Sequence, residues 1–255
     1  MKLITTVVFC VLVSYSYAIH NGQVVQPNSI PYQVLLLVKR GDKTSKCGGS
    51  LVKPDRVLTA AHCLKDRDSV EVIVGAHKIH DRREKTRQSQ TVEPSNLFPH
   101  PTWAPGKGHD VGIVKLPEPF ELNEYVDTIK LPYGLDDESF NGEIAKIAGW
   151  GEIDDNPRDH VGPLRAVENP IISNHDCRKH HVKIDSGNLC LSEKGGRRTC
   201  SGDSGGPLVV RFNGEIIQVG LTSKGDSHGC DTVAPSIFTR VTSYLDNFID
   251  KHLSE

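Results

Sequence analysis

The sequence predicts an all-β protein, from two observations. Short apolar runs, each bounded by turn-forming residues, recur along the chain, and this rhythm is typical of sandwiches and barrels. Helical spacing occurs in one segment only, at the C-terminal end. The chain contains no internal repeat and no linker rich in Pro or Gly, but the segment 117–132 fits a crossing between two halves.

The expected strands are short apolar runs distributed over most of the chain. They cover residues 32–38, 49–52, 56–60, 70–74, 111–116, 144–150, 208–212, 216–222 and 236–241. The last segment, 242–253, repeats Tyr244, Leu245, Phe248 and Ile249 on one helical face, so we expect a single terminal helix that docks on the sheets.

Composition excludes two classes of function. The 30 Lys and Arg residues are balanced by 32 Asp and Glu, for a net charge of -2, so the chain has no basic field to hold a nucleic acid backbone. The only long apolar run, residues 3–13, is too short to span a bilayer core of about 30 Å. We therefore expect neither nucleic acid nor membrane as a partner.

The N-terminal run predicts a signal peptide over residues 1–18. Lys2 precedes the apolar stretch, which ends in Ser16, Tyr17 and Ala18, with small residues at the two positions that a signal peptidase reads. The mature protein is then secreted and extracellular. Cleavage of the signal peptide would remove Cys10 and leave six cysteines. In an oxidising compartment, six cysteines predict up to three disulfides, and their spacing alone allows about fifteen connectivities. The sequence contains no CxxC pair, so a zinc site is the weaker interpretation of these cysteines.

Three short motifs carry the chemistry. TAAHC contains His62, HDVGIVKL contains Asp110, and CSGDSGGPL is centred on Ser204. A serine hydroxyl is a weak nucleophile that needs an adjacent base, and the base needs a carboxylate to fix its tautomer and stabilise the imidazolium. The three residues supply nucleophile, base and orienting carboxylate.

These motifs, in this order, resemble the chymotrypsin/trypsin family of serine endopeptidases. The resemblance covers essentially the whole mature chain, because the strings IHNG, CGGSL and AGWG also match the family. Two further strings, GLTS and FTRVTSYLDNFI, resemble the arthropod chymotrypsin and collagenase-like branch. It implies two antiparallel six-stranded β-barrels with a C-terminal α-helix and an active site in the cleft between them. The expected division is a signal peptide at 1–18, an N-terminal barrel at 19–130, and a C-terminal barrel with the helix at 131–255.

The resemblance also assigns roles beyond the triad. It implies an oxyanion hole made by the backbone N–H groups of Gly202 and Ser204, in a glycine turn that lets the backbone approach the substrate. It implies three disulfides, which pair Cys47 with Cys63, Cys177 with Cys190, and Cys200 with Cys230.

Activation in the family depends on a new N-terminal ammonium that folds inward to pair with the Asp before the nucleophile. Here those residues are Ile19 and Asp203. Because Ile19 directly follows Ala18, the expected signal cleavage and the activating cut coincide, and we expect no propeptide.

The primary specificity pocket departs from the trypsin pattern. The resemblance places Arg198 at its base, where trypsin-like enzymes hold an aspartate, and Ser223, Lys224, Gly225 and Ser236 on its walls. The two cations suggest an acidic substrate side chain. In the alternative, Arg198 pairs internally with Asp226 or Asp231 or blocks the pocket, which leaves a preference for small or apolar residues.

The resulting expectation is a secreted, monomeric serine endopeptidase that hydrolyses peptide bonds through an acyl-enzyme. Its expected partners are protein or peptide substrates and protein inhibitors of proteases. No histidine cluster has both the ligand count and a carboxylate at metal-binding spacing, so we expect neither metal nor cofactor. The alternative is a catalytically silent secreted homologue that acts as a binding protein.

Overall fold

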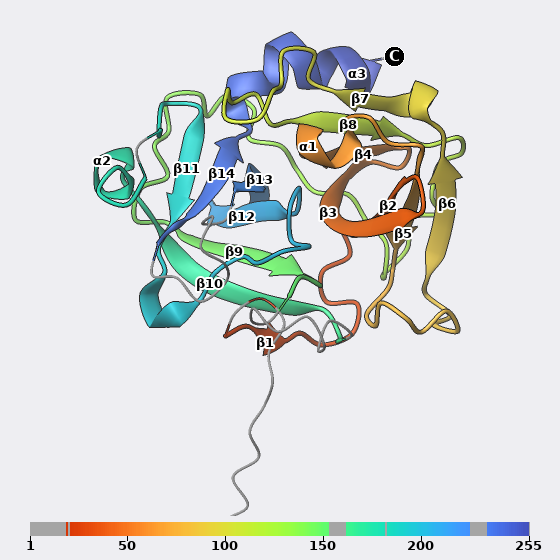
Figure 1. The fold of residues 1–255 in the computed structure, drawn as a ribbon. Helices are drawn as coiled ribbons and strands as arrows, with labels where there is room; N and C mark the ends of the chain where they lie inside the picture. Colours follow the sequence, from red (N-terminus) through yellow and green to blue (C-terminus); the bar gives the residue numbers. More distant parts are fainter. Residues whose placement is uncertain (1–18, 20, 153–161, 182, 225–233, 255) are drawn as a thin grey trace, which may run out of the picture.

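The computed structural model describes residues 19, 21–152, 162–181, 183–224 and 234–254 (Figure 1). Their strands form two antiparallel sheets of seven strands each, and the expected fold class is confirmed. The predicted signal peptide lies outside the described residues. None of the described helices is long and apolar enough to cross a membrane.

The first sheet contains the strands of the N-terminal half in the order β6-β5-β2-β3-β4-β8-β7. Its elements are β2 (Gln33–Arg40), β3 (Lys43–Lys53), β4 (Arg56–Thr59), α1 (Ala61–Leu64), β5 (Ser69–Val74), β6 (Gln88–Val92), a 3-10 turn (Pro94–Asn96), β7 (Leu97–Pro99) and β8 (Gly112–Lys115). β2 and β3 form a long hairpin, with Gln33 opposite Ser50 and Arg40 opposite Lys43.

Strand alternation explains why β2 is apolar on both faces. Val34 and Leu36 point into the core of the first sheet, whereas Leu35 packs in a second cluster that also contains Trp150 and Val209 of the other half. Successive side chains of a strand point to opposite faces. β2 therefore supplies both the interior of its own sheet and the contact between the two halves.

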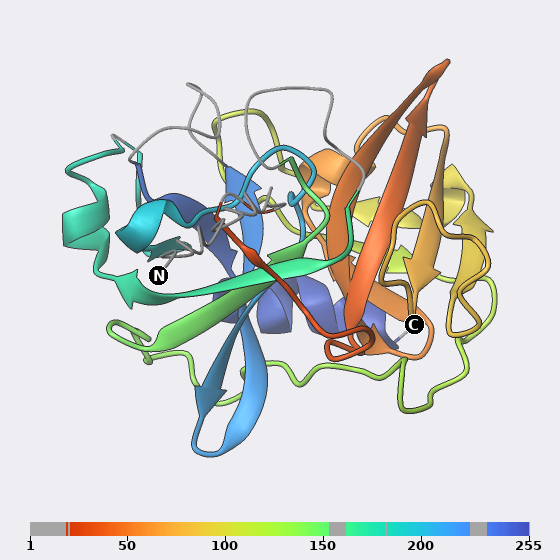
Figure 2. The ribbon, with the colours of Figure 1, turned by 90° about the horizontal axis from the view of Figure 1, so that it is seen from below.

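The second sheet has the order β1-β10-β11-β14-β13-β12-β9, and β9 also pairs with β10, which closes a ring of six strands. Its elements are β1 (Gln23–Val24), β9 (Ile144–Gly149), β10 (Arg165–Ile172), α2 (Asn174–Cys177), β11 (Asn188–Leu191), a 3-10 turn (Lys194–Gly196), β12 (Pro207–Phe212), β13 (Glu215–Lys224) and β14 (Ser236–Arg240). β1 is the seventh strand and comes from the start of the described chain (Figure 2). The domain division at residue 130 stays a prediction.

The C-terminal helix is less regular than its spacing predicts. It consists of a 3-10 turn (Thr242–Tyr244), a π-helical turn (Leu245–Ile249) and α3 (Asp250–Ser254). Leu245, Phe248 and Ile249 pack with Leu58 and Ile113 of the first sheet. The changes in winding accompany this packing, because apolar contacts rather than local propensity set most of the stability of a short helix.

Two cations from the first sheet cap this helix. Lys53 Nζ donates to the carbonyl oxygen of Leu253 at 2.6 Å, and Arg56 Nε donates to that of His252 at 2.8 Å. These are carbonyls of the last helical turn, which have no partner within the helix. The last turn of α3 is thereby held against the first sheet.

Candidate active site

His62 and Asp110 lie beside two neighbouring strands of the first sheet. His62 lies on α1, the single helical turn that follows β4, and Asp110 precedes β8, which pairs with β4. Asp110 Oδ2 lies 2.8 Å from His62 Nδ1, and its Oδ1 accepts a hydrogen bond from the main-chain N–H of His62 at 3.0 Å. The carboxylate therefore holds both the ring and the backbone of the histidine, and leaves Nε2 free to accept a proton.

Asp110 is kept ionised by its hydrogen bonds although it is only 4% exposed. Burial by itself raises its pKa, but hydrogen bonds from the His62 ring, the Ser223 hydroxyl and the His62 main chain outweigh burial and lower the pKa overall. Ser223 Oγ donates to Asp110 Oδ2 at 2.6 Å. The family resemblance predicts Ser223 on the pocket wall, but no motif signals this contact of its hydroxyl.

Ser204 is brought to the same place by a turn that packs against the strand leading to His62. Gly48 N–H donates to the Ser204 carbonyl at 2.7 Å, and Thr59 Oγ1 donates to the Gly48 carbonyl at 2.7 Å. Gly205 has φ +80° and packs so closely that a Cβ would lie 2.1 Å from Thr59 Oγ1. Only glycine permits this approach.

The turn leaves two backbone donors unused. Neither Gly202 N–H, at φ +96°, nor Ser204 N–H donates to any residue that the structure describes. The Ser204 hydroxyl likewise makes no hydrogen bond to the His62 ring within the described part of the chain. Such contacts are often long in a protein without substrate and tighten in its complex. The arrangement can stabilise an oxyanion and can transfer a proton between Ser204 and His62.

Asp203 is buried directly behind this turn, at 2% exposure. Its two oxygens accept main-chain hydrogen bonds from Gly151 at 2.8 Å and Cys200 at 2.9 Å. Burial nevertheless raises its pKa to about 6. An ionised Asp203 therefore needs a positive charge nearby.

Ile19 is fully buried in the core of the second sheet, beside Phe140 and Phe238. Its φ of +47° is rare for a β-branched residue. His20 lies outside the described residues.

Lys46 is a residue at this site that the sequence did not single out. Its Nζ donates to the Trp150 carbonyl at 3.0 Å, and a Cβ on Gly202 would lie 3.4 Å from its Cε. Burial lowers the pKa of Lys46, partly offset by the charge of Asp203. Lys46 is therefore a cation beside the turn that contains Ser204. No motif in the sequence could have identified it, because a lysine in a strand is usually a solvent-exposed residue.

The pocket residues are only partly described. Arg198 is 6% exposed and Ser236 is 4% exposed. Ser236 Oγ accepts from Thr199 N–H at 3.2 Å, which joins the wall strand to the residue after Arg198. Gly225, Asp226 and Asp231 lie outside the described residues, as does the side chain of Lys224.

Two expected disulfides are present, between Cys47 and Cys63 and between Cys177 and Cys190. The first ties β3 to the turn that carries His62, so its sulfurs are not available to hold a metal. Cys200 is also disulfide-bonded, whereas its expected partner Cys230 lies outside the described residues.

A small cavity of about 200 Å³ adjoins His62 and Asp110. Trp103, Ala104 and Pro105 line it together with Ser223. It is mostly apolar, and so can accept an apolar group of a ligand next to His62 and Asp110.

The chain matches a known protein family over most of its length. A family model described as trypsin matches residues 19–248. The chain belongs to the trypsin family. This membership confirms the predicted enzyme class, a chymotrypsin-like serine endopeptidase.

Relatives and a solved structure agree with the family. The chain is 37% identical over 224 residues to brachyurin of Leptuca pugilator, which covers 86% of this chain and 92% of that protein. It is 38% identical over 240 residues to chymotrypsin of Phaedon cochleariae, covering 93% and 83%. The structure of HL collagenase has a TM-score of 0.82 at 28% identity and covers 93% of this chain and 99% of that chain. The resemblance to the arthropod chymotrypsin and collagenase-like branch is confirmed.

Proposed function

We propose that this protein of the trypsin family is a secreted endopeptidase that cleaves proteins or peptides through an acyl-enzyme on Ser204. The observation that carries the proposal is the hydrogen bond of 2.8 Å between His62 Nδ1 and Asp110 Oδ2, next to the unused N–H groups of Gly202 and Ser204. His62 Nε2 takes the Ser204 proton during attack and returns it to the leaving amine. The two N–H groups bind the oxyanion of the tetrahedral intermediate.

A serine-directed fluorophosphonate tests this proposal. We expect it to label the protein that begins at Ile19, and Ser204→Ala to abolish labelling. Ser201→Ala is the matched control, because Ser201 is an exposed serine in the same turn and should leave labelling unchanged. Absence of labelling in a folded protein would contradict the proposal and favour the silent binding homologue.

The proposed activation step is pairing of Asp203 with the ammonium of Ile19. Its support is the burial of both residues and the raised pKa of Asp203. Cleavage between Ala18 and Ile19 creates the cation that a buried carboxylate needs. N-terminal sequencing of the secreted protein should read Ile19 first.

The pocket is proposed to exclude Lys and Arg side chains, because Arg198 is a buried cation at its base. Cleavage-site profiling on a peptide library separates the two remaining preferences. Cuts after Asp or Glu would mean that Arg198 faces the substrate, and cuts after apolar residues that its charge is neutralised internally. Cuts after Lys or Arg would refute the proposed exclusion.

Secretion and the remaining partners are proposals as well. The two disulfides suit an oxidising compartment and agree with a signal peptide at 1–18. Protein inhibitors of proteases are the expected regulators, and the protein is expected to act as a monomer.

A further inference from the structure

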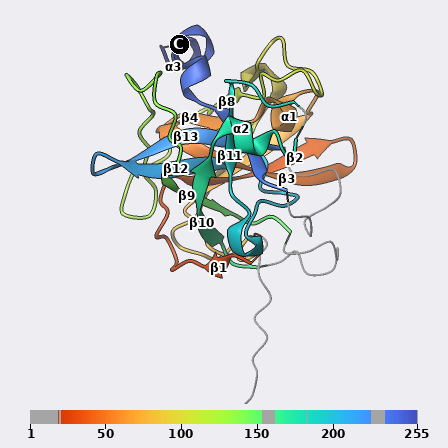
Figure 3. The ribbon, with the colours of Figure 1, turned by 90° about the vertical axis from the view of Figure 1, so that its left-hand side faces the viewer.

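A second cavity lies away from the catalytic residues, between the two sheets. Its volume is about 630 Å³, and Ile30, Tyr32 and Ile129 line one side while strands β9, β12 and β13 line the other. The hairpin between β12 and β13 and helix α1 with His62 lie on opposite sides of the molecule (Figures 2 and 3). The volume lies within the usual range of small-molecule sites, about 300–1,000 Å³.

The walls of this rear cavity are mostly apolar. Ile30 and Ile129 form its buried part, whereas Ile144 and Ile216 at its rim are 56% and 41% exposed. Exposed isoleucines beside a cavity extend the apolar surface that a ligand can cover. The cavity therefore suits the apolar body of a ligand.

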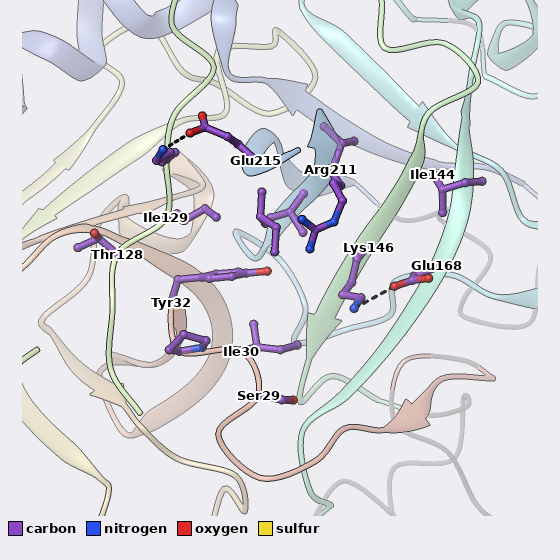
Figure 4. A pocket seen from close by; sticks show the side chains of 15 residues that line it. Ser29, Ile30, Tyr32, Thr128, Ile129, Ile144, Lys146, Glu168, Arg211 and Glu215 are labelled. Atoms are coloured by element: carbon purple, nitrogen blue, oxygen red, sulfur yellow. Dashed lines mark hydrogen bonds and ion pairs between the residues drawn. The ribbon is translucent and has the colours of Figure 1, made fainter. Parts of the chain in front are cut away.

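The charges at the rim leave one cation without a carboxylate. Lys146 pairs with Glu168 at 2.9 Å, and Lys130 pairs with Glu215 (Figure 4). Arg211 makes a hydrogen bond from Nη1 to the carbonyl of Gly214 at 3.0 Å and has no acidic partner within the described part of the chain. A guanidinium has five N–H donors, so most of those on Arg211 remain for a ligand.

Tyr32 adds a second donor at the same place. It is only 9% exposed, and its hydroxyl makes no hydrogen bond to any other described residue. Figure 4 shows the hydroxyl of Tyr32 and the guanidinium of Arg211 pointing into the same space. Burial raises the pKa of Tyr32 to about 12, so the phenol is a hydrogen-bond donor at neutral pH. The hydroxyl oxygen itself is not among the fully buried atoms that lack a partner, so it is open to an acceptor that enters the cavity.

We propose that the rear cavity binds an apolar monocarboxylate, with its carboxylate on Arg211 and Tyr32 and its apolar body against Ile30, Ile129 and Ile216. A single charge on the ligand matches the one cation without an acidic partner. Arginine and carboxylate form two parallel hydrogen bonds. The same chemistry is presented by a free aliphatic or aromatic acid and by the C-terminal carboxylate of a peptide with an apolar last residue.

Titration calorimetry on the Ser204→Ala protein tests this proposal without any contribution from catalysis. The probe is 4-phenylbutyrate and its neutral counterpart is 4-phenylbutanol. We expect the acid to bind at least about tenfold more tightly than the alcohol, since hydrogen bonds to charged groups are the stronger ones. Absence of binding at millimolar concentration, or equal binding of acid and alcohol, would overturn the proposal.

Variants locate the site. Arg211→Gln should weaken binding of the acid at least about tenfold, and Tyr32→Phe, which keeps the ring, by about threefold or more. Arg40→Gln is the matched control, because Arg40 is exposed at the end of the β2–β3 hairpin and lies outside the cavity. Unchanged binding in Arg211→Gln, or equal loss in Arg40→Gln, would refute the assignment.

Binding of two peptides that end in Phe, one with a free C-terminal carboxylate and one amidated, identifies the source of the carboxylate. Tighter binding of the free-carboxylate peptide assigns the cavity to peptide termini. Binding of 4-phenylbutyrate alone assigns it to free acids. Because Ser204→Ala is inactive by design, failure here is distinguishable from failure of the proposed peptidase activity.

Discussion

A blocked N-terminus should give the protein a pH-dependent loss of stability that the form beginning at Ile19 lacks. The perturbation is an uncharged extension of several residues before Ile19, compared with the unextended form, both carrying Ser204→Ala to prevent self-digestion. The two forms differ in whether the ammonium belongs to Ile19 or to the extension. All other titrating groups are shared and cancel in the comparison.

The magnitude follows from the pKa of Asp203, which burial raises from an ordinary 3.8 to about 6. A carboxyl with a raised pKa destabilises the fold as pH rises from its unfolded pKa to its folded pKa, because the folded state holds the proton more tightly. Two pKa units at 1.36 kcal/mol each give about 3 kcal/mol. Pairing with the ammonium of Ile19 removes this loss by stabilising the ionised form.

Urea unfolding of both forms between pH 4 and pH 7 measures the difference. We expect it to be small at pH 4 and to reach about 3 kcal/mol at pH 7, with the extended form the less stable. At alkaline pH the difference should shrink again, since the ammonium loses its proton. An equal difference at pH 4 and pH 7 would refute the pairing of Ile19 with Asp203.

Three further outcomes follow from the site and its supports. Ser223→Ala removes a hydrogen bond to ionised Asp110 and should lower kcat/KM for a peptide substrate about tenfold. An unchanged kcat/KM would show that this hydrogen bond does not contribute to catalysis. Lys46→Met keeps the aliphatic stem but removes the charge that lowers the pKa of Asp203. The hydrogen bond to Trp150 is lost at every pH, so in urea unfolding the extended form should lose about 1 kcal/mol more at pH 7 than at pH 4, and an equal loss at both would contradict the role of the charge. Replacing Cys177 and Cys190 by Ala opens a loop of 13 residues and should cost about 2–4 kcal/mol in urea unfolding, whereas no loss would mean that the loop is already ordered by its packing.

The sequence predicted those parts of the site that depend on residue types in short motifs. His62, Asp110 and Ser204 each lie in a local string, and the sheets that bring them together follow from apolar runs bounded by turns. The disulfide between Cys47 and Cys63 required the family resemblance, because spacing alone leaves many connectivities open.

Contacts between segments far apart in the chain could not be predicted in this way. Ser223 and Asp110 are 113 residues apart in the chain, and neither residue type predicts a hydrogen bond to the other. The rear cavity likewise depends on Tyr32, which directly precedes β2, and on Arg211 of β12. Strand β1 is too short to give a periodic signal, and it pairs with the second sheet although it precedes the first.

The terminal helix shows how packing overrides a local pattern. Its spacing predicts one regular helix, but π winding over Leu245–Ile249 accompanies the contacts of Leu245, Phe248 and Ile249 with the first sheet. Such a change in winding is set by the surface on which the helix docks. It carries no signature in the sequence of the helix itself.

Trapping the acyl-enzyme tests the central claim most directly. The protein beginning at Ile19 is incubated with a 4-nitrophenyl ester, quenched in acid and measured by intact mass and peptide mapping. The proposed mechanism predicts a burst of one nitrophenolate per protein and one acyl group on Ser204, both lost in Ser204→Ala and retained in Ser201→Ala. Turnover of the ester without an acyl group on Ser204, or an equal burst in Ser204→Ala, would contradict it.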